Sequence, residues 1–446
     1  MNADRISRRS RKYLIYALGL LSVIEALAAM DRSIFSVLMP AIKRELVLSD
    51  TELGLLSGLA FTLFYGFFGL PIGLLADRYA RGKVLALSLF LWSVTTAASG
   101  AARSGAELFL ARMGAGVGEA GSLPPAHALL SGYFAPARRP VIFALHTIGG
   151  MLGVMLGLIL GGILADRVGW RMTYVLVGLP GVAVAIVAWL TLREPAPVGT
   201  VDQSLASTET SGVLGLIVQR PAYRHVVLAL AGGAIGTYGF AQWTPSFYVR
   251  TFGLSLSTTG VLSGVVTGVS AIVGLLLGGI AGAVVLKRWG AKAMARCLAA
   301  EYLLAAFGYA AMFSSRGLSS ALAFQTLAVF FNLATLPPAF ALIQGVSPAR
   351  VRARAAAVMT LTINIIGGGL APLVIGFASD HLASLLGTEA LRRVLVIASC
   401  FMLWPVMHML WTSRTVVSDL MREETKGGGS PATDRTVIIG RASGTR

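Results

Sequence analysis

The sequence has few charged residues and almost no cysteine. Only 13% of its 446 residues are charged, whereas 55% are hydrophobic. Soluble domains carry roughly 25% charged residues, and a soluble chain of this length could not bury so much apolar side chain. The two cysteines, Cys297 and Cys400, both fall in hydrophobic stretches and form neither a disulfide framework nor a metal-ligand pattern. The composition therefore excludes an ordinary soluble fold.

Motifs of common catalytic and nucleotide-binding sites are also missing. The sequence contains no phosphate-binding loop and no Ser/His/Asp or metal-ligand constellation. We therefore expect neither an enzyme nor a bound cofactor or metal ion. The net charge of +17 raises the question of nucleic-acid binding. Because the basic residues lie in short loops between apolar runs rather than in one patch, no nucleic-acid partner is expected.

Hydrophobic stretches of about 20 residues, long enough to cross a bilayer, recur along the chain. They predict an all-α integral membrane protein with twelve transmembrane helices. The basic start and apolar continuation of the N-terminus imitate a signal peptide, but the run continues toward Pro40, so we expect a first span and no cleavage. The predicted spans are 13–39, 51–75, 84–102, 107–134, 141–165, 172–192, 225–248, 257–285, 294–313, 319–346, 355–378 and 394–412.

These spans divide the chain into two halves. The predicted parts are an N-terminal tail (1–12), a six-helix bundle (13–192), a linker (193–224), a second six-helix bundle (225–412) and a disordered tail (413–446). Most of the Lys and Arg residues lie in loops on the side of the N-terminus. Since such residues are retained in the cytoplasm, we expect a multi-pass protein of the cell membrane with both termini cytoplasmic, in the inner membrane if the cell is bacterial.

An internal repeat relates the two halves. The segment LPPAHALLSG at Leu123–Gly132 returns as LPPAFALIQG at Leu336–Gly345. The repeat relates spans that lie six apart, so the two halves are parallel repeats with the same orientation. Parallel repeats are typical of transporters that bind substrate between the halves near the bilayer midplane.

The segment after the second span carries a family motif. GLLADRYARGKVL at Gly73–Leu85 resembles the loop 2–3 signature of the major facilitator superfamily, with Ala80 where many members have glycine. The resemblance implies a cytoplasmic latch. Gly73 is expected to let a neighbouring helix approach closely, and Asp77 to lie at a helix N-terminus. The implied latch residues are Gly73, Asp77, Arg78, Arg81 and Lys83.

Further segments resemble the Spinster branch of that superfamily, namely MDRSIFSVLMPAI, ARMGAGVGEAG and QWTPSFYVR. The resemblance implies a secondary transporter that moves an amphipathic or lipid-like organic solute, such as a lysophospholipid or a sphingolipid, by alternating access and with proton coupling. Expected partners are the solute, protons and membrane lipids, and we expect a monomer. The alternatives are a symporter of small organic acids or anions, a drug efflux carrier, an intramembrane hydrolase, and a non-transporting receptor or scaffold.

Three charged residues inside predicted spans are the candidates for proton coupling: Asp31, Arg112 and Glu119. A charge at the bilayer centre costs at least ~2.5–3.5 kcal/mol, so it needs a partner or a function. Arg112 and Glu119 are seven residues apart, which puts them on one helix face about 10.5 Å apart, too far for a direct pair. Our hypothesis is that Asp31 approaches this face and that Arg112 pairs with either carboxylate as the protein changes state. The alternative is a static ion network that orients spans 1 and 4.

Other intramembrane polar residues have weaker assignments. Arg32 and Glu25, also seven residues apart, either join this network or, for Arg32, reach toward the membrane interface. We expect His146 to be a buried histidine with satisfied hydrogen bonds. If the substrate is a lysolipid, Arg112 could also bind its phosphate.

Glycines and amphipathic residues complete the candidate site. Gly114, Gly118 and Gly121 have the spacing of a close helix contact, and we expect them to let other helices reach Glu119. For the substrate pocket we expect amphipathic side chains in spans 7, 10 and 11, although aromatic residues of membrane helices also serve packing. These candidates are Tyr238, Gln242, Trp243, Asn332 and Asn364.

Overall fold

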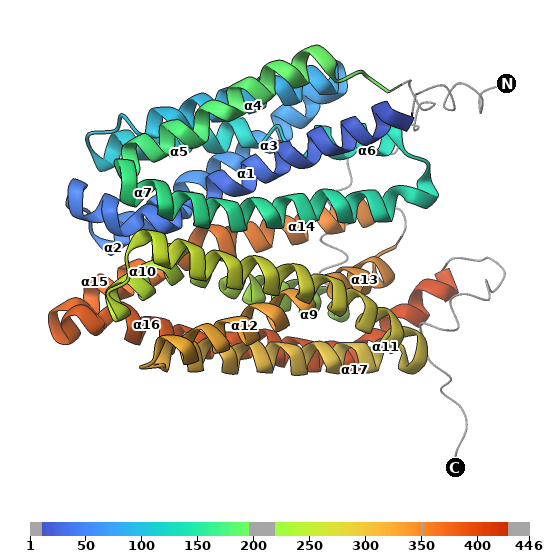
Figure 1. Ribbon diagram of the computed structural model, residues 1–446. Coiled ribbons are helices and arrows are strands. Elements are labelled where there is room, and N and C mark those ends of the chain that lie inside the picture. The colour runs from blue at the N-terminus through green and yellow to red at the C-terminus, as the bar shows by residue number, and fades with distance from the viewer. Residues whose placement is uncertain (1–10, 196–218, 349–350, 427–446) are drawn as a thin grey trace. The chain divides into compact units, whose positions relative to one another are not determined.

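The computed structural model describes residues 11–195, 219–348 and 351–426, and every regular element in these ranges is helical (Figure 1). The first helices are α1 (Arg11–Leu46), α2 (Asp50–Ser57), α3 (Leu59–Arg78), α4 (Arg81–Ser99), α5 (Gly105–Glu119), α6 (Leu123–Tyr133) and α7 (Arg139–Thr191). They are followed by α9 (Pro221–Ala234), the π-helix η3 (Ile235–Phe240), α10 (Ala241–Phe252), α11 (Leu256–Ser314), α12 (Leu318–Ala334) and α13 (Leu336–Val346). The last are α14 (Arg352–Ile363), the π-helix η5 (Asn364–Leu370), α15 (Ala371–Leu386), α16 (Ala390–Ser399) and α17 (Leu403–Lys426).

The helices account for the twelve predicted spans. Eight helical segments of the described residues are long and apolar enough to cross a membrane. Three of them hold two spans each, and α7 and α11 bend sharply at Gly169 and Gly290, where φ is 78°. Glycine adopts such a positive φ without the steric cost that other residues meet. Span 4, formed by α5 and α6, completes the twelve.

Spans 4 and 10 are interrupted at matching places of the internal repeat. Span 4 breaks between α5 and α6, just before Pro124 and Pro125, and span 10 breaks at Thr335, just before Pro337 and Pro338. Proline has no amide proton and clashes with the preceding turn, so it interrupts the helical hydrogen-bond ladder. The break in span 4 leaves Glu119 as the last residue of α5.

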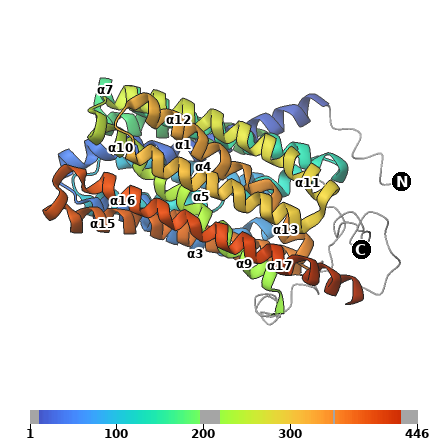
Figure 2. The ribbon, with the colours of Figure 1, turned by 90° about the horizontal axis from the view of Figure 1, so that it is seen from below.

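The described residues group into two compact units. The first comprises 11–195 with Thr244–Gly268, and the second comprises 219–243, 269–348 and 351–426. In the first unit, α7 packs along α1 and α4, and α5 packs against α3 and α4 (Figures 1 and 2). In the second unit, α9 packs against α17 and α14, and the π-helices η3 and η5 pack together.

The first unit includes a segment that the sequence assigned to the second half. Thr244–Gly268 joins it through tight contacts between α11 and α7. A Cβ atom placed on Gly260 would lie 2.3 Å from the Leu158 carbonyl oxygen, so the two backbones nearly touch. Asp166 Oδ2 accepts a hydrogen bond from the Ser257 amide at 2.7 Å, near the start of α11. The boundary between the units therefore differs from the predicted linker.

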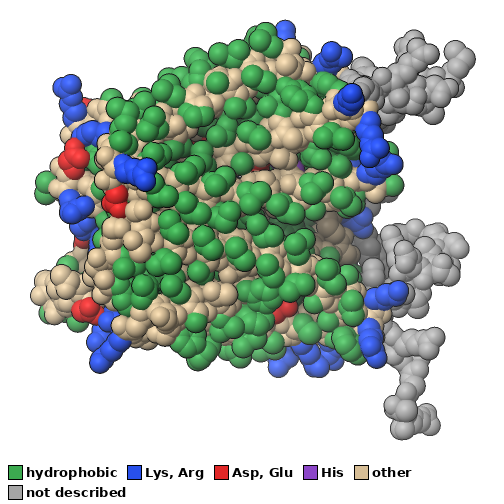
Figure 3. Space-filling model, in the orientation of Figure 1, with side chains coloured by type: hydrophobic (Ala, Val, Ile, Leu, Met, Phe, Trp, Pro, Cys, Tyr) green, Lys and Arg blue, Asp and Glu red, His purple; other side chains and the backbone are tan. Residues whose placement is uncertain are grey.

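The outer surface suits a lipid environment. Hydrophobic side chains cover most of the face seen in Figure 3, and few Lys or Arg side chains interrupt them. Large apolar residues such as Phe67 and Leu190 are more than 70% exposed. Because such exposure is unfavourable in water, the surface agrees with a multi-pass membrane protein.

The predicted tails differ in part from the structure. The last helix, α17, continues to Lys426 instead of ending at Thr412, so residues 413–426 are helical rather than disordered. In this extension, Ser418 Oγ donates to the Thr415 carbonyl, and Thr415 Oγ1 donates to the Trp411 carbonyl in the preceding turn. Most of the predicted linker (196–218), most of the N-terminal tail (1–10) and the rest of the C-terminal tail (427–446) lie outside the described residues.

Candidate functional site

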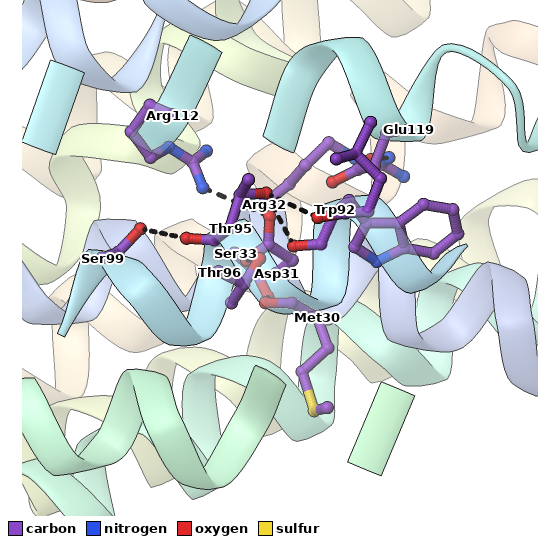
Figure 4. Close-up of polar contacts among 11 residues, drawn as sticks. Met30, Asp31, Arg32, Ser33, Trp92, Thr95, Thr96, Ser99, Arg112 and Glu119 are labelled. Carbon is purple, nitrogen blue, oxygen red and sulfur yellow. Dashed lines mark hydrogen bonds and ion pairs between the residues drawn. The ribbon is translucent and has the colours of Figure 1, made fainter. Parts of the chain in front are cut away.

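Asp31 and Arg112 form a buried ion pair between α1 and α5 (Figure 4). Arg112 Nη1 donates to Asp31 Oδ2 at 3.2 Å, and Thr96 Oγ1 of α4 donates to Asp31 Oδ1 at 2.8 Å. Only 2% of Asp31 and 1% of Arg112 are exposed. The carboxylate therefore depends on these two donors for the solvation that it loses on burial.

Aromatic rings surround the buried guanidinium. The Arg112 Cζ atom lies 5.4 Å from the ring centroids of both Phe35 and Phe61. A cation at this distance from a ring is attracted to the negative face of the π system. Arg112 Nε has no hydrogen-bond partner among the described residues. Asp31 is thus the strongest anionic contact that the geometry gives this cation.

A second ion pair lies beside the first. Arg32 Nη1 donates to Glu119 Oε2, and Glu119 is fully buried at the end of α5 (Figure 4). Its other oxygen, Oε1, has no partner among the described residues. Arg32 is about one-third exposed, and its Nη2 also lies 3.7 Å from Glu25 Oε1. Consecutive residues of α1, Asp31 and Arg32, therefore take part in two carboxylate–arginine pairs.

The structure brings together the three candidate residues but changes one pairing. Asp31 meets Arg112, as we expected, whereas the partner of Glu119 is Arg32 instead of Arg112. In the sequence, the only indication that Arg32 joins the network was its spacing of seven residues from Glu25. That spacing did not predict the contact with Glu119, because sequence alone does not show whether the Arg32 side chain turns inward or toward the membrane interface.

The glycines of span 4 are confirmed as a packing surface. A Cβ atom on Gly118 would lie 2.6 Å from the Trp92 backbone nitrogen, and one on Gly114 would lie 2.7 Å from Thr95 Cγ2. One on Gly121 would lie 2.0 Å from Ser88 Oγ. These glycines let α4 come close to α5, and this contact places Thr96 beside Asp31.

A small cavity adjoins the Asp31 carboxylate. It encloses about 10 Å³, and Leu27, Trp92 and Ser93 are among its lining residues. This volume is close to that of a single water molecule, and a buried water needs polar partners such as the nearby carboxylate and hydroxyl groups. The cavity thus gives Asp31 room for one water.

A larger cavity of about 790 Å³ lies elsewhere in the first unit, lined by residues of α1, α7, α10 and α11. Three of its lining side chains are the cations Lys43, Arg44 and Arg250. Arg250 donates two hydrogen bonds of 2.7 Å to Asp50, which also accepts from Lys43. Asp166 also lines the cavity, so its lining contains more cations than anions, and two of those cations share the Asp50 carboxylate.

The predicted latch residues lie where α3 ends and α4 begins. Arg81 Nη1 is 3.8 Å from Glu194 Oε1, and Lys83 Nζ lies 5.5 Å from the Trp189 ring centroid. Arg78 is exposed in the last turn of α3. These contacts join the loop to the end of α7 and the residues that follow it.

Two details of the latch differ from the expectation. A Cβ atom on Gly73 would meet nothing within 4 Å, so Gly73 is not the site of a close helix approach. The close approach occurs at Gly82 instead, where a Cβ atom would lie 3.1 Å from Leu192 Cβ. Asp77 belongs to the C-terminal turn of α3 and not to a helix N-terminus. The extra turn of α3 explains the second difference, because it carries Asp77 within the helix.

The predicted pocket residues of the second unit fall into two groups. Trp243 and Asn332 are buried and hold helices together: Trp243 Nε1 donates to the Pro372 carbonyl at 3.0 Å, and Asn332 Nδ2 donates to Thr237 Oγ1 at 2.9 Å. They are therefore packing residues in this structure. Tyr238 is 39% exposed, and Gln242 Oε1 has no partner among the described residues.

The sequence did not predict the π-helices of the second unit. Tyr238 lies in η3, and Asn364 begins η5, which packs against η3. Single π-helical turns occur frequently at functional sites. The glycine run at Gly367–Gly369 was the only signal, and it does not distinguish a π-turn from an ordinary close contact. Within the described ranges, no group of three or more His, Cys, Asp or Glu could hold a metal ion.

Comparisons with known proteins agree with this architecture. The family model described as Major Facilitator Superfamily matches residues 21–372. An MFS-type efflux pump of Mycolicibacterium smegmatis is 33% identical over 407 residues, which cover 89% of this chain and 92% of that protein. A hexuronate transporter of Bacillus subtilis is 25% identical over 377 residues, covering 82% and 88%. The crystal structure of a bacterial homolog to the human lysosomal transporter Spinster, inward-facing and unoccupied, has a TM-score of 0.81 at 26% identity and covers 95% of this chain and 100% of that one.

Proposed function

The chain belongs to the Major Facilitator Superfamily, in its Spinster-like branch, and we propose that it couples proton movement to solute transport by alternating access. Its relatives are transporters and not enzymes. One observation carries the coupling proposal. Two buried carboxylates, Asp31 and Glu119, each bind an arginine inside membrane-spanning helices of one unit.

Proton binding at Glu119 changes these contacts. When Glu119 is ionised, it holds Arg32; when it gains a proton, the charge that attracts Arg32 is lost. A carboxyl group that moves between an arginine and an apolar environment changes its affinity for a proton. By linkage, the conformations with different affinities are then favoured to different extents by the proton. Arginine suits the partner role because it stays charged at all physiological pH values.

The Asp31–Arg112 pair has a different part in this proposal. It is enclosed by Thr96 and two phenylalanine rings, and it holds α1 and α5 together. The cavity beside Asp31 supplies a place for the water that would bring a proton to this carboxylate. We propose that Asp31 and Glu119 each bind and release a proton, one after the other, during the transport cycle. Arg112 is the ion-pair partner of Asp31, and Arg32 is the partner of Glu119.

For the substrate we propose an amphipathic, lipid-like organic anion, with a lysophospholipid or a sphingolipid phosphate as the leading class. The basic cavity lined by Lys43, Arg44 and Arg250 supports the anionic end of such a molecule. Within the second unit, Tyr238, Gln242 and Asn364 stay the candidate solute contacts. Efflux of amphipathic drugs is a second candidate, since the M. smegmatis relative is an efflux pump. The hexuronate relative favours small organic acids as a third.

The remaining assignments follow from the same proposal. We place both termini and the latch of Asp77, Arg78, Arg81 and Lys83 on the cytoplasmic side of the cell membrane, because the basic loops lie there by the positive-inside rule. The protein would act as a monomer, with the solute, protons and membrane lipids as its partners.

The proposal is tested with purified protein in proteoliposomes. Three labelled solutes are offered with and without an imposed pH gradient: a lysophosphatidic acid, ethidium and glucuronate. We expect lysophosphatidic acid movement to increase with the gradient and to collapse when an ionophore dissipates it. Movement of ethidium alone supports the efflux candidate, and movement of glucuronate alone supports the organic-acid candidate. Flux of the lipid that ignores the pH gradient would contradict proton coupling.

A further inference from the structure

A second group of titratable side chains adjoins Glu119 without belonging to either ion pair. Glu25 of α1 lies between Arg32 and His146 of α7: its Oε1 is 3.7 Å from Arg32 Nη2, and its Oε2 is 3.9 Å from His146 Nε2. The His127 ring of α6 meets the His146 ring edge-on, with centroids 5.6 Å apart. Side chains from α1 and α6 thus converge on the imidazole of α7.

His146 is buried without hydrogen bonds. Only 1% of the residue is exposed, and neither ring nitrogen has a partner among the described residues. The sequence predicted a satisfied histidine here, and that expectation is wrong. Buried polar groups are nearly always hydrogen-bonded, to protein or to ordered water. An imidazole left in this state points to a ligand that it can bind: a proton, or the water that carries one.

The surrounding backbone makes room for this group. A Cβ atom on Gly150 would lie 3.3 Å from the Glu25 carboxylate, so a larger residue there would crowd the contact between Glu25 and His146. The gap of 3.9 Å between Glu25 Oε2 and His146 Nε2 is longer than a direct hydrogen bond and is the kind of gap that a bridging water fills.

We propose that His146 is a second proton-binding site, linked to Glu119 through Arg32 and Glu25. The proposal rests on the proton-coupled function above and extends it. Arg32 reaches two carboxylates, Glu119 and Glu25, and Glu25 reaches two cations, Arg32 and protonated His146. Arg32 and the His146 imidazolium therefore compete for Glu25.

Because of this competition, a proton on Glu119 lowers the affinity of His146 for a proton, and the reverse also holds. With Glu119 ionised, Arg32 pairs with it, and Glu25 is available to stabilise a proton on His146. With Glu119 protonated, Arg32 turns to Glu25, and its positive charge opposes a proton on His146. Transfer of one proton from a Glu119 oxygen to His146 through water keeps the summed charge of Glu25, Arg32, Glu119 and His146 at zero, so the transfer leaves no uncompensated charge in the membrane interior.

The position of His146 gives the transfer a direction. His146 lies seven residues from the start of α7 at Arg139, which corresponds to about 10 Å along the helix. Glu119 lies 14 residues before the end of α6 at Tyr133, about twice as far from the same end of the unit. The proton would thus pass from Glu119 toward the end that carries Arg138 and Arg139, with His127 beside the path. The titratable groups that face His146 are Glu25 from α1 and His127 from α6, and Arg32 and Glu119 follow on the far side of Glu25.

The test follows the titration of each histidine by NMR on protein labelled with ¹⁵N-histidine, without solute or gradient. His146→Gln assigns the His146 signal, and His381, which lies in the second unit and stacks on Phe377, is the internal control. In Glu119→Gln, a neutral mimic of the protonated carboxyl, we expect the His146 titration midpoint to fall by about one pH unit, a tenfold loss of proton affinity. The same comparison is then made without Arg32. Between Arg32→Gln and the double variant Arg32→Gln/Glu119→Gln, the His146 midpoint should shift by less than half as much.

Three results would overturn the inference. The first is a His146 signal that does not titrate between pH 4 and 9, and the second is a midpoint that is equal in the original protein and in Glu119→Gln. The third is a shift shared by His381, because it would show a global effect. None of these results bears on solute flux. Conversely, if the His146 midpoint shifts as expected but solute flux does not respond to the pH gradient, only the proposed function is contradicted.

Discussion

At the scale of single residues, the candidate site is defined by which arginine meets which carboxylate. Arg112 is enclosed with Asp31 by Thr96 and aromatic rings, whereas Arg32 is one-third exposed and reaches both Glu119 and Glu25. The Asp31–Arg112 pair is enclosed by other side chains, whereas Arg32 can leave Glu119 and pair with Glu25. We therefore assign a positioning role to Arg112 and the exchange of partners to Arg32.

Removing Arg112 alone should be costly. In Arg112→Gln, Asp31 remains buried without its counter-charge, which typically costs about 3–5 kcal/mol of unfolding free energy. Adding Asp31→Asn removes that charge and should restore part of the loss, measured as thermal unfolding of the detergent-purified protein. Glu389→Gln, which breaks a more exposed pair with Arg392 and leaves the backbone contacts of Arg392 in place, is the control and should cost less than about 1 kcal/mol. Equal stability of Arg112→Gln and the double variant would contradict the buried pair.

The hydroxyl of Thr96 should matter more than that of Thr95. Thr96→Val removes the hydrogen bond to Asp31 while keeping the shape of the side chain, and we expect a loss of about 1 kcal/mol. Thr95→Val is the matched control, because the Thr95 hydroxyl donates to the Leu91 and Trp92 carbonyls of its own helix. Unfolding temperatures that fall equally in both variants would refute the assigned role of Thr96.

At the scale of helices, glycine and proline positions decide how closely the network can be assembled. The sequence predicted the packing glycines of span 4, because small-residue spacing has local consequences. It did not predict the direction of Arg32 or the π-helices η3 and η5. Those features depend on what neighbouring helices place opposite them, which local patterns do not record.

The contact between α4 and α5 gives a test at this scale. Gly118→Val would force a side chain into the Trp92 backbone and should cost about 1–3 kcal/mol through overpacking. Gly73→Ala is the control, since a Cβ atom there meets nothing within 4 Å. Thermal unfolding of the two purified variants distinguishes them. A Gly118→Val protein as stable as Gly73→Ala would show that α4 and α5 lie further apart than described.

At the scale of the whole molecule, composition and repeats were enough to predict the architecture. The twelve spans, the membrane setting and the superfamily agree with the helices and with the family match. The extent of α17 and the grouping of Thr244–Gly268 with the first unit could not be predicted, because they depend on contacts between distant segments. Substrate choice depends in the same way on side chains brought together from several helices.

The central claim is that Glu119 carries the coupled proton, and comparing two transport modes in Glu119→Gln tests it most directly. In proteoliposomes, solute exchange at equal pH needs no net proton movement, whereas accumulation against a gradient does. We predict that Glu119→Gln keeps solute exchange within about twofold and loses at least about tenfold in pH-driven accumulation, a factor equivalent to about 1.4 kcal/mol of coupling. Glu389→Gln, a carboxylate variant outside the network, should keep both. Full pH-driven accumulation by Glu119→Gln would contradict the account.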